Sequence, residues 1–364
     1  MSQDKEACLR AAVVGVGYYG SFHAEKYATL PGSSLVAVAD HNADHAERAA
    51  TEYEVPAYSD HRELIGKVDL ASVVVPAKGH FQVARDLIEA GIHVLIEKPI
   101  TRTVEEAETL IELARKHEVV LQVGHLERFN PAFRALPDSL RSPSYIESHR
   151  LTPFPKRNAD VSVVLDLMIH DIDLVLALAG SPVKSIQAKG VSVFSDALDM
   201  VNAVLHFENG TVANLTASRA STQPQRTLHL FQQNAYTTLD LHAKDLVIQH
   251  RKSEHSDSIA TEEIRCDNAD VLRTEVMSFL NAVRDGSPPA VTGEDGLSAL
   301  ATANWIMDVV EKDQSPMEPL AIFEDGENGN ISSRVHHDPH PETNETVFSR
   351  SSLVSGKEKE NKES

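Results

Sequence analysis

The first 125 residues alternate short apolar runs with longer stretches in which apolar residues recur every three or four positions. The short runs predict buried strands, and the longer stretches predict amphipathic helices. The expected strands are 9–17, 33–40, 69–77, 93–99 and 119–125, and the expected helices are 19–30, 45–53, 80–91 and 103–118. This alternation predicts a parallel, doubly wound sheet that is covered on both faces. We therefore expect a first α/β domain over residues 1–125.

The pattern changes after residue 125. Apolar and polar residues now alternate with a period of two, which predicts antiparallel strands. The expected strands are 145–151, 183–194, 200–219, 226–242 and 245–251, and the expected helices are 163–179, 271–286 and 294–312. We expect a second domain over 126–323. Residues 324–364 are polar and poor in core residues, which predicts a disordered tail.

Composition narrows the possible partners and the compartment. The 364 residues carry a formal net charge of −20, which argues against nucleic acid as a partner. Two cysteines, Cys8 and Cys266, are typical of a chain from a reducing cytoplasm. No apolar run approaches the roughly 18 residues of a membrane span, and the first ten residues lack a signal-peptide core. We expect a cytoplasmic protein without a membrane partner.

A glycine-rich stretch, VVGVGYYG, directly follows the first expected strand and opens a helix. Its G-x-G-x-x-G spacing in this context predicts a dinucleotide site. The first glycine permits a tight turn, the second a close approach of the pyrophosphate, and the third close packing of helix on strand. The residues expected to hold the dinucleotide here are Gly15, Gly17, Tyr18, Tyr19 and Gly20. The alternative is a purely structural glycine turn.

Polar residues also stand at the ends of the following strands, where ligands of such sheets bind. Asp40 ends the second strand, and a carboxylate there accepts from ribose hydroxyls and repels a 2′-phosphate, so we expect NAD rather than NADP. Pro76 and His80 follow the third strand, and Glu97 and Lys98 follow the fourth. These four are expected on the cofactor edge. A solvated turn is the alternative for the charged pair.

The helix expected over 163–179 is apolar nearly all round, yet it carries Asp166, His170 and Asp173 at positions i, i+4 and i+7. These residues share one face of a regular helix. Their uncompensated burial would cost about 2–7 kcal/mol each. A structural hydrogen-bonded cluster, a metal site, or a histidine oriented by an aspartate for acid–base work would each explain them. No further ligand cluster is evident, so we expect no metal.

Together, G-x-G-x-x-G, Glu97-Lys98-Pro99 and the D-x-x-x-H-x-x-D pattern of Asp166, His170 and Asp173 resemble the Gfo/Idh/MocA oxidoreductase family over residues 8–323. The resemblance implies an NAD-binding Rossmann domain. It also implies a second α/β domain with a large open mixed, mainly antiparallel sheet, whose outer face makes the contacts of a dimer or tetramer. It further implies that the Lys98–Pro99 peptide bond is cis.

Within the family, residues 123–133, 163–173 and 213–219 resemble bacterial dehydrogenases that oxidise the C3 hydroxyl of UDP-N-acetylglucosamine. Their 3-keto product goes to an aminotransferase, which makes an amino sugar for lipid A or surface polysaccharide. By this resemblance Lys98 is the catalytic base, with a pKa lowered by burial and by the cationic nicotinamide. His170, oriented by Asp166, shares the proton, and Glu97 positions Lys98 or the cofactor.

A UDP-sugar carries two phosphates, so the second domain must offer cations despite the net charge. The expected substrate-binding residues are Arg128, Asn130, Arg157, Arg219 and Tyr236, with Arg150, Lys156 and Arg226 as further candidates. An ordinary surface charge is the alternative for each arginine.

Two rival functions stay open. One is a different sugar or inositol dehydrogenase of the same family, which would not need the arginines. The other is a non-catalytic dinucleotide sensor, which would not need Lys98, Asp166 and His170. A turnover assay discriminates among the three.

Overall fold

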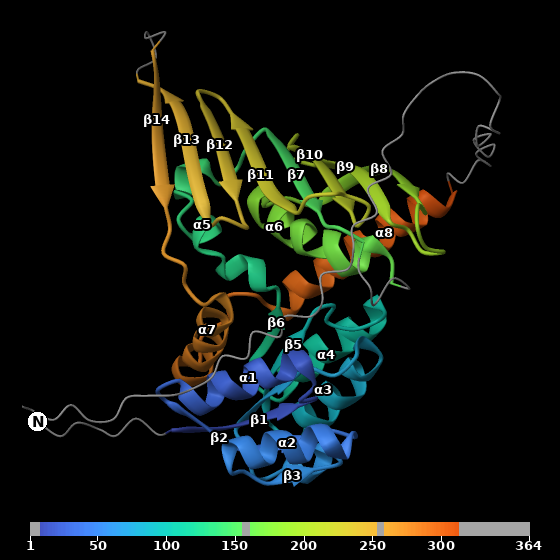
Figure 1. The fold of residues 1–364 in the computed structure, drawn as a ribbon, viewed down its shortest axis with the longest axis vertical. Helices are drawn as coiled ribbons and strands as arrows, with labels where there is room; N and C mark the ends of the chain where they lie inside the picture. The colour runs from blue at the N-terminus through green and yellow to red at the C-terminus, as the bar shows by residue number, and fades with distance from the viewer. Residues whose placement is uncertain (1–7, 155–160, 253–257, 313–364) are drawn as a thin grey trace, which may run out of the picture. The chain divides into compact units, whose positions relative to one another are not determined.

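A computed structural model describes residues 8–154, 161–252 and 258–312 of the chain, which contain two sheets and the helices around them (Figure 1). The tail expected over 324–364 lies outside the described residues, as do Lys156 and Arg157. Among the described helices, none has the length and apolar character that a membrane crossing requires.

The first sheet has the strand order β3-β2-β1-β4-β5-β6, and all of its neighbouring strands are parallel. The strands are β1 Leu9–Val14, β2 Ser33–Ala39, β3 Ala57–Tyr58, β4 Leu70–Val73, β5 His93–Glu97 and β6 Leu121–Gly124. This is the strand order of a Rossmann sheet. Successive strands are first added on one side of β1, and from β4 onwards they are added on its other side. The predicted parallel sheet is confirmed. The edge strand β3 was not expected, because two residues give no periodic signal.

The helices of this half are α1 Tyr18–Thr29, α2 Ala43–Tyr53, α3 His80–Glu89 and α4 Val104–Lys116, with the 3₁₀ turns η1 His61–Leu64 and η2 Ala77–Gly79. Two of the four α-helices of this half, α2 and α4, begin at a side-chain cap that the sequence supplies. At the start of α4, the Thr103 hydroxyl accepts from the Glu106 N–H. Glu105 and Glu106 occupy the first turn of α4, and Arg115 and Lys116 the last. These charges oppose the helix dipole and stabilise both ends.

Two late helices pack against the first sheet. They are α7 Val271–Asp285 and α8 Gly293–Lys312. Val276 and Phe279 of α7 are fully buried in one cluster with Val13 of β1 and Tyr27 of α1. On the opposite face of the sheet, α3 and α4 share a cluster with Leu300 of α8. The chain therefore returns from the second domain to cover the first sheet (Figure 1).

The second sheet has the order β14-β13-β12-β11-β7-β10-β9-β8. Its strands are β7 Tyr145–Leu151, β8 Val183–Val191, β9 Met200–Phe207, β10 Val212–Ser218, β11 Gln225–Gln232, β12 Ala235–Asp240, β13 Asp245–Arg251 and β14 Ile259–Arg265. Only β7 and β10 pair in parallel; the other neighbours in this sheet are antiparallel. The predicted open mixed, mainly antiparallel sheet is confirmed.

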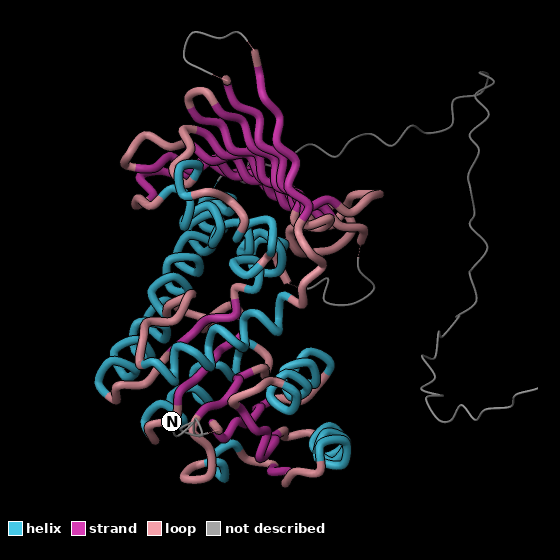
Figure 2. The backbone as a smooth tube through the Cα atoms, turned by 90° about the vertical axis from the view of Figure 1, so that its left-hand side faces the viewer, coloured by secondary structure: helices cyan, strands magenta, loops and turns pink. Residues whose placement is uncertain are grey.

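One face of the second sheet packs against α6 Ile169–Ala179 and α8 (Figures 1 and 2). On β9, Val201, Ala203 and Leu205 are fully buried on this face, and the residues between them point the other way. The remaining short elements are η3 Leu126–Phe129, α5 Pro131–Arg134, η4 Asp138–Leu140 and η5 Val164–Met168. The helix expected over 163–179 therefore begins with a π-helical turn, η5, before α6.

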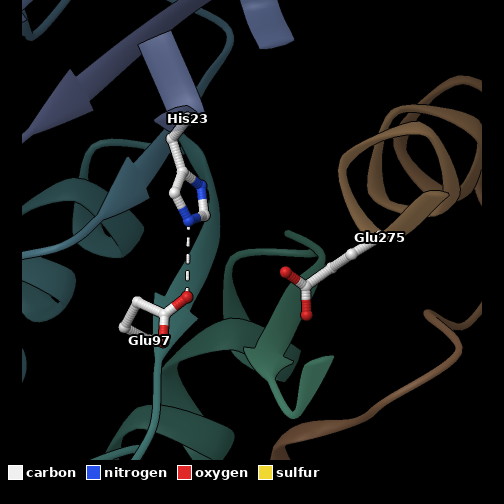
Figure 3. A group of neighbouring side chains, drawn as sticks. All are labelled: His23, Glu97 and Glu275. Atoms are coloured by element: carbon white, nitrogen blue, oxygen red, sulfur yellow. Dashed lines mark ion pairs between the residues drawn. The ribbon is translucent and has the colours of Figure 1, made fainter. Parts of the chain in front are cut away.

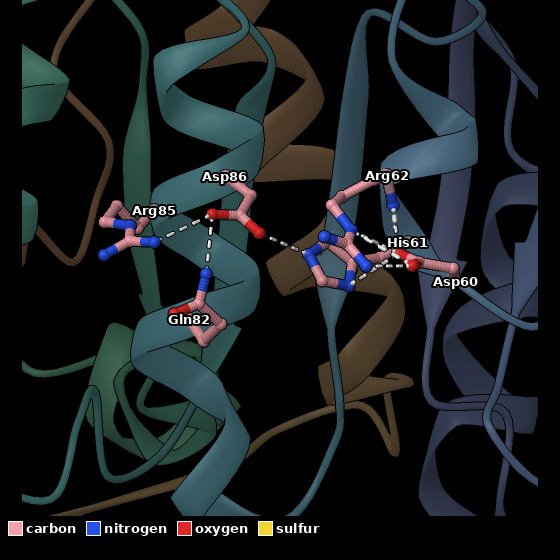
Figure 4. A network of polar contacts seen from close by, with 6 residues as sticks. All are labelled: Asp60, His61, Arg62, Gln82, Arg85 and Asp86. Carbon is pink, nitrogen blue, oxygen red and sulfur yellow. Dashed lines mark hydrogen bonds and ion pairs between the residues drawn. The ribbon is translucent and has the colours of Figure 1, made fainter.

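A polar network ties η1 to α3 (Figure 4). The His61 ring lies 3.0 Å from the Asp86 carboxylate, which also accepts from Gln82 and Arg85. His61 lines a pocket of about 220 Å³ together with Asp40 and Pro76. The network therefore holds the loop after β3 in place beside the carboxyl edge of the first sheet.

Candidate active site

A cleft of about 1060 Å³ opens at the carboxyl ends of the strands of the first sheet. Its lining includes every residue that the sequence predicted for cofactor binding. These are Gly15, Gly17, Tyr18, Tyr19, Gly20, Asp40, Pro76, His80, Glu97 and Lys98. Leu165 and Asp166 of η5 and Asn304 of α8 line it too. Asp166 was a predicted catalytic residue, whereas Leu165 and Asn304 were not predicted at this edge, because the sequence does not show that their elements lie against the first sheet.

The glycine loop has the shape that a pyrophosphate needs. Gly15 has a φ of +86°, and a Cβ there would lie 2.6 Å from the Val74 carbonyl oxygen. A Cβ on Gly20 would lie 1.8 Å from the Gly15 carbonyl oxygen, whereas a Cβ on Gly17 would meet nothing closer than 3.8 Å. Gly17 caps α1 and leaves the helix N-terminus without a side-chain cap. The residues present therefore fit a bound dinucleotide, whose phosphates would meet the N–H groups of α1.

Asp40 is held in place at the end of β2. Its carboxylate accepts from the N–H groups of Val16 and Asn42, both at 2.9 Å. The rings of His41 and His45 each lie 3.5 Å from it. The carboxylate thus braces the glycine loop and also borders the cleft, where the predicted ribose contact would be made.

His80 connects two strand ends rather than pointing freely into the cleft. Its Nδ1 lies 2.7 Å from the Pro99 carbonyl oxygen, and its Nε2 lies 2.8 Å from that of Val75. Burial lowers the pKa of His80. A neutral ring can donate to only one of the two carbonyls. The described contacts of His80 therefore hold the loop that carries Lys98.

Lys98 lies at the end of β5, and the peptide bond between Lys98 and Pro99 is cis. Its Nζ donates to the Asp166 carbonyl oxygen at 2.8 Å and lies 3.9 Å from Asp166 Oδ1. Burial lowers the pKa of Lys98, and the charge of Arg150 lowers it further, while Asp166 and Glu97 act in the opposite direction. A lysine with a lowered pKa is available as a base nearer to neutral pH.

His170 stands in the first turn of α6, near Lys98 but outside the cleft lining. Burial and the charges of Lys98 and Arg150 place the pKa of His170 well below its ordinary value, so the ring is neutral. Its Nδ1 has no hydrogen-bond partner in the described structure. Asp166 and His170 share no hydrogen bond among the described residues. The π-helical turn offsets the expected i, i+4 stacking of the pair, and the predicted orienting contact is missing.

Two family models match this chain. Residues 9–125 match the oxidoreductase family with an NAD-binding Rossmann fold, and residues 142–236 match the GFO/IDH/MocA C-terminal domain. Over 307 residues the chain is 39% identical to the UDP-N-acetylglucosamine 3-dehydrogenase of Acidithiobacillus ferrooxidans, covering 83% of this chain and 97% of the relative. The chain belongs to the Gfo/Idh/MocA oxidoreductase family.

Solved structures agree with this membership. A structure of the A. ferrooxidans enzyme matches with a TM-score of 0.79 over 84% of this chain and 98% of its own. A levoglucosan dehydrogenase in complex with NADH, 19% identical, shares the fold with a TM-score of 0.75. A more distant relative in sequence is the NAD(+)-dependent scyllo-inositol 2-dehydrogenase of Bacillus subtilis, 27% identical over 79% of this chain and 90% of its own. The family places NAD as the cofactor of the first domain.

In this Gfo/Idh/MocA chain, the two described arginines that were expected to bind substrate have partners within the protein. Arg128 donates to both carboxylate oxygens of Asp173, at 2.7 and 2.9 Å, and also contacts Asp295. Arg219 is 1% exposed and donates to backbone carbonyls of Val161 and Leu198. Neither lines the cleft. The sequence shows that an arginine lies near a family motif. It does not show which carboxylate or carbonyl group of the folded chain already binds that arginine.

Asn130 and Tyr236 are also directed elsewhere. Asn130 caps α5 through the Ala132 N–H and donates to Glu127 and to the Leu241 carbonyl oxygen. Tyr236 lies 2.8 Å from His229 Nδ1, on the face of the second sheet opposite α6, because strand residues alternate. The structure therefore brings neither residue to the cleft.

A buried ionic network next to the site was not anticipated. Arg150 of β7 donates to both carboxylate oxygens of Asp171, at 2.7 and 3.0 Å, and to Glu127 at 3.0 Å. Arg150 and Asp171 are 3% and 2% exposed. Arg150 is thus not a surface phosphate ligand. Its buried charge instead lowers the pKa values of Lys98 and His170.

His125 lies near Lys98, and it was not among the residues singled out from the sequence. It follows β6 and is 1% exposed, and within the described structure neither ring nitrogen has a hydrogen-bond partner. Burial lowers its pKa, and the charges of Asp173, Arg128 and Lys98 act on it. Its position just after a strand of the parallel sheet was the signal that could have identified it.

Proposed function

We propose that this protein oxidises the C3 hydroxyl of UDP-N-acetylglucosamine, or of a related UDP-sugar, to the 3-keto sugar nucleotide with NAD. The substrate is supported by the 39% identity that extends over 97% of the A. ferrooxidans enzyme. The reaction class is supported by one observation: Lys98 reaches across to the Asp166 carbonyl oxygen, 2.8 Å away, inside the cleft that the glycine loop borders.

Lys98 is the general base in this proposal. A bound nicotinamide ring supplies the hydride acceptor. The lysine must be neutral to take the hydroxyl proton, and its burial favours the neutral amine. The carbonyl oxygen of Asp166 holds Nζ at a fixed place, and the Asp166 carboxylate, 3.9 Å away, stabilises the ammonium that forms.

His170 and Glu97 assist Lys98 from two sides. Among the described residues, Nδ1 of the neutral His170 ring has no partner, so it is able to accept a hydrogen bond from a substrate hydroxyl or from Lys98. Glu97 Oε2 accepts from the Lys98 backbone N–H at 3.2 Å, and so orients the residue from behind.

The substrate diphosphate needs a cation that is not already neutralised. Arg226, at the start of β11, has a side chain that is 44% exposed, and its nearest carboxylate, Glu127, is 3.9 Å away. Its charge lowers the pKa of His170, so it lies close to that ring. We assign Arg226 to the diphosphate, in place of Arg128 and Arg219.

The remaining proposals concern partners. The 3-keto product suits a downstream aminotransferase, which would form an imine at the new carbonyl and give an amino sugar for lipid A or surface polysaccharide. The outer face of the second sheet, which carries His149, His229 and Tyr236, would join protomers in a homo-oligomer.

The test is NADH formation with UDP-N-acetylglucosamine beside free N-acetylglucosamine, glucose and inositol. A coupled aminotransferase should be present to remove the keto product, because the equilibrium of the oxidation lies towards the alcohol at neutral pH. Turnover of the UDP-sugar alone supports the proposal. An inositol dehydrogenase is the second candidate, favoured by the B. subtilis relative and by the internal pairing of Arg128 and Arg219. Faster turnover of inositol than of the UDP-sugar would establish it instead.

A further inference from the structure

Three polar side chains from distant parts of the chain meet next to Lys98. They are His23 of α1, Glu97 of β5 and Glu275 of α7 (Figure 3). One nitrogen or oxygen of each lies within 4.8 Å of the other two. His23 and Glu275 are fully buried, and the Glu97 side chain is 13% exposed. The established family chemistry does not explain why α7 inserts a carboxyl group here.

Glu275 has no cationic partner among the described residues. Neither carboxyl oxygen has a hydrogen-bond partner in the described structure. The titratable groups that face it are Glu97 of β5 and Tyr19, His23 and Tyr27 of α1. Burial, and then the charge of Glu97, raise the pKa of Glu275 well above its ordinary value. An ionised carboxylate in this position would lack solvent and a counter-charge together.

A chain of hydroxyl groups determines which nitrogen of His23 carries the proton. Tyr27 Oη lies 2.9 Å from Ser72 Oγ, and Ser72 Oγ lies 3.1 Å from His23 Nδ1. If Tyr27 donates to Ser72, and Ser72 to Nδ1, then the N–H of His23 is on Nε2. This nitrogen lies 3.3 Å from Glu97 Oε1, although the described structure shows no hydrogen bond between the two atoms. The reverse order would place a bare nitrogen lone pair against that carboxylate. The first order therefore fits the contact between His23 and Glu97 better.

We propose that Glu275 is a protonated carboxylic acid in the folded enzyme and shares its proton with Glu97. Glu97 then faces three donor groups: the Glu275 O–H, the His23 Nε2–H, and the backbone N–H of Lys98, which already donates to Glu97 Oε2 at 3.2 Å. These donors hold the Glu97 carboxyl group in one orientation. Glu275 is a positioning residue that acts on Lys98 through Glu97. The effect on catalysis rests on the role proposed for Lys98, but the protonation does not.

Infrared spectroscopy tests the protonation without an activity measurement. At about pH 8, far above the ordinary glutamate pKa of about 4.3, the wild type should show a carboxylic-acid carbonyl band that shifts in heavy water. Glu275→Gln should abolish this band, and the control Glu108→Gln, at an exposed position on α4, should retain it. A spectrum unchanged by Glu275→Gln would overturn the proposal. So would a stoichiometric metal ion found by elemental analysis of the dialysed protein.

Stability against pH provides a second test. A glutamate whose pKa is higher in the folded state binds more protons there than in the unfolded chain. The wild type should therefore lose stability relative to Glu275→Gln as pH rises from about 4.3 towards the folded pKa. The difference in melting temperature between the two proteins is the readout. A difference that changes in the opposite direction would show that Glu275 is ionised.

The positioning role has its own test. Glu275→Leu removes the donor to Glu97 and should lower kcat by about ten- to a hundredfold through misplacement of Lys98, with a changed pH profile. Glu275→Gln, whose amide N–H also donates, should restore most of the activity. A folded Glu275→Leu protein with wild-type kcat and pH profile would refute the positioning role. Loss of the infrared band in Glu275→Gln, combined with full activity of Lys98→Met, would refute the proposed function and leave the shared proton standing.

Discussion

The Nζ of Lys98 lies 2.8 Å from the backbone carbonyl oxygen of Asp166, although 68 positions separate the two residues in the chain. This contact joins the end of β5 in the first domain to the π-helical turn η5 in the second. Because the backbone rather than the carboxylate accepts, the position of Nζ depends on the fold of η5 more than on the Asp166 side chain. The two residues therefore yield separate predictions.

Lys98→Met should lower turnover by at least about a hundredfold, because it keeps the apolar stem and removes the base. NAD binding, measured by fluorescence titration, should change much less, because the glycine loop is untouched. Lys116→Met, at an exposed position of α4, is the matched control. A folded Lys98→Met protein with normal turnover would show that the base lies elsewhere.

Asp166→Asn should shift the pH profile of kcat towards lower pH. The negative charge of Asp166 raises the pKa of Lys98, so its removal lowers that pKa further, and the neutral base appears at lower pH. The backbone carbonyl contact is retained. Asp308→Asn on the exposed side of α8 should leave the profile in place. A shift towards higher pH would contradict this electrostatic account.

His170→Asn should also lower turnover, because it replaces the neutral ring next to Lys98. Combined with Lys98→Met, the loss should be smaller than the product of the two single losses, as expected for residues in one proton path. Single-turnover kinetics of the four proteins provides the comparison. Fully multiplicative losses would mean that the two residues act independently.

Asp40→Ala should narrow the preference for NAD over NADP, because it removes the carboxylate that opposes a 2′-phosphate. It should also weaken NAD binding, since Asp40 accepts from the Val16 N–H of the glycine loop at 2.9 Å. Kd values for both cofactors are the measurement. Equal affinity of the wild type for the two cofactors would contradict the assignment.

Arg150→Met should destabilise the folded protein by about 3–5 kcal/mol, because it leaves the buried carboxylates of Asp171 and Glu127 without their cation. Urea unfolding measures the loss. The double variant Arg150→Met/Asp171→Leu should recover part of it, since one unpaired charge is then gone. If Arg150→Met is as stable as the wild type, the prediction is wrong, and Asp171 then takes up a proton without lowering the free energy of unfolding.

The residues of the cleft that are expected to bind the dinucleotide could be predicted from the sequence. Gly15 lies in the turn between β1 and α1, and Gly20 lies in the first turn of α1. Asp40 and Lys98 follow strands that are recognisable as short apolar runs. Parallel strands of one sheet bring their carboxyl ends to one edge. Local periodicity therefore sufficed to place ten predicted residues in the lining of one cleft.

For the residues that were expected to bind substrate, tertiary contacts decide which of them are available. A cation such as Arg128 looks available in sequence, but Asp173, 45 positions away, already binds it. The π-helical turn before α6 likewise separates Asp166 from His170, and local spacing does not reveal it. In the sequence, Glu275 is an ordinary polar residue of the helix α7. It is buried beside His23 and Glu97 only because α7 packs against the first sheet. The sequence by itself determines which polar side chains are available and which faces of the helices and strands are apolar. The pairing of charges across distant elements determines which of them remain free to meet a substrate.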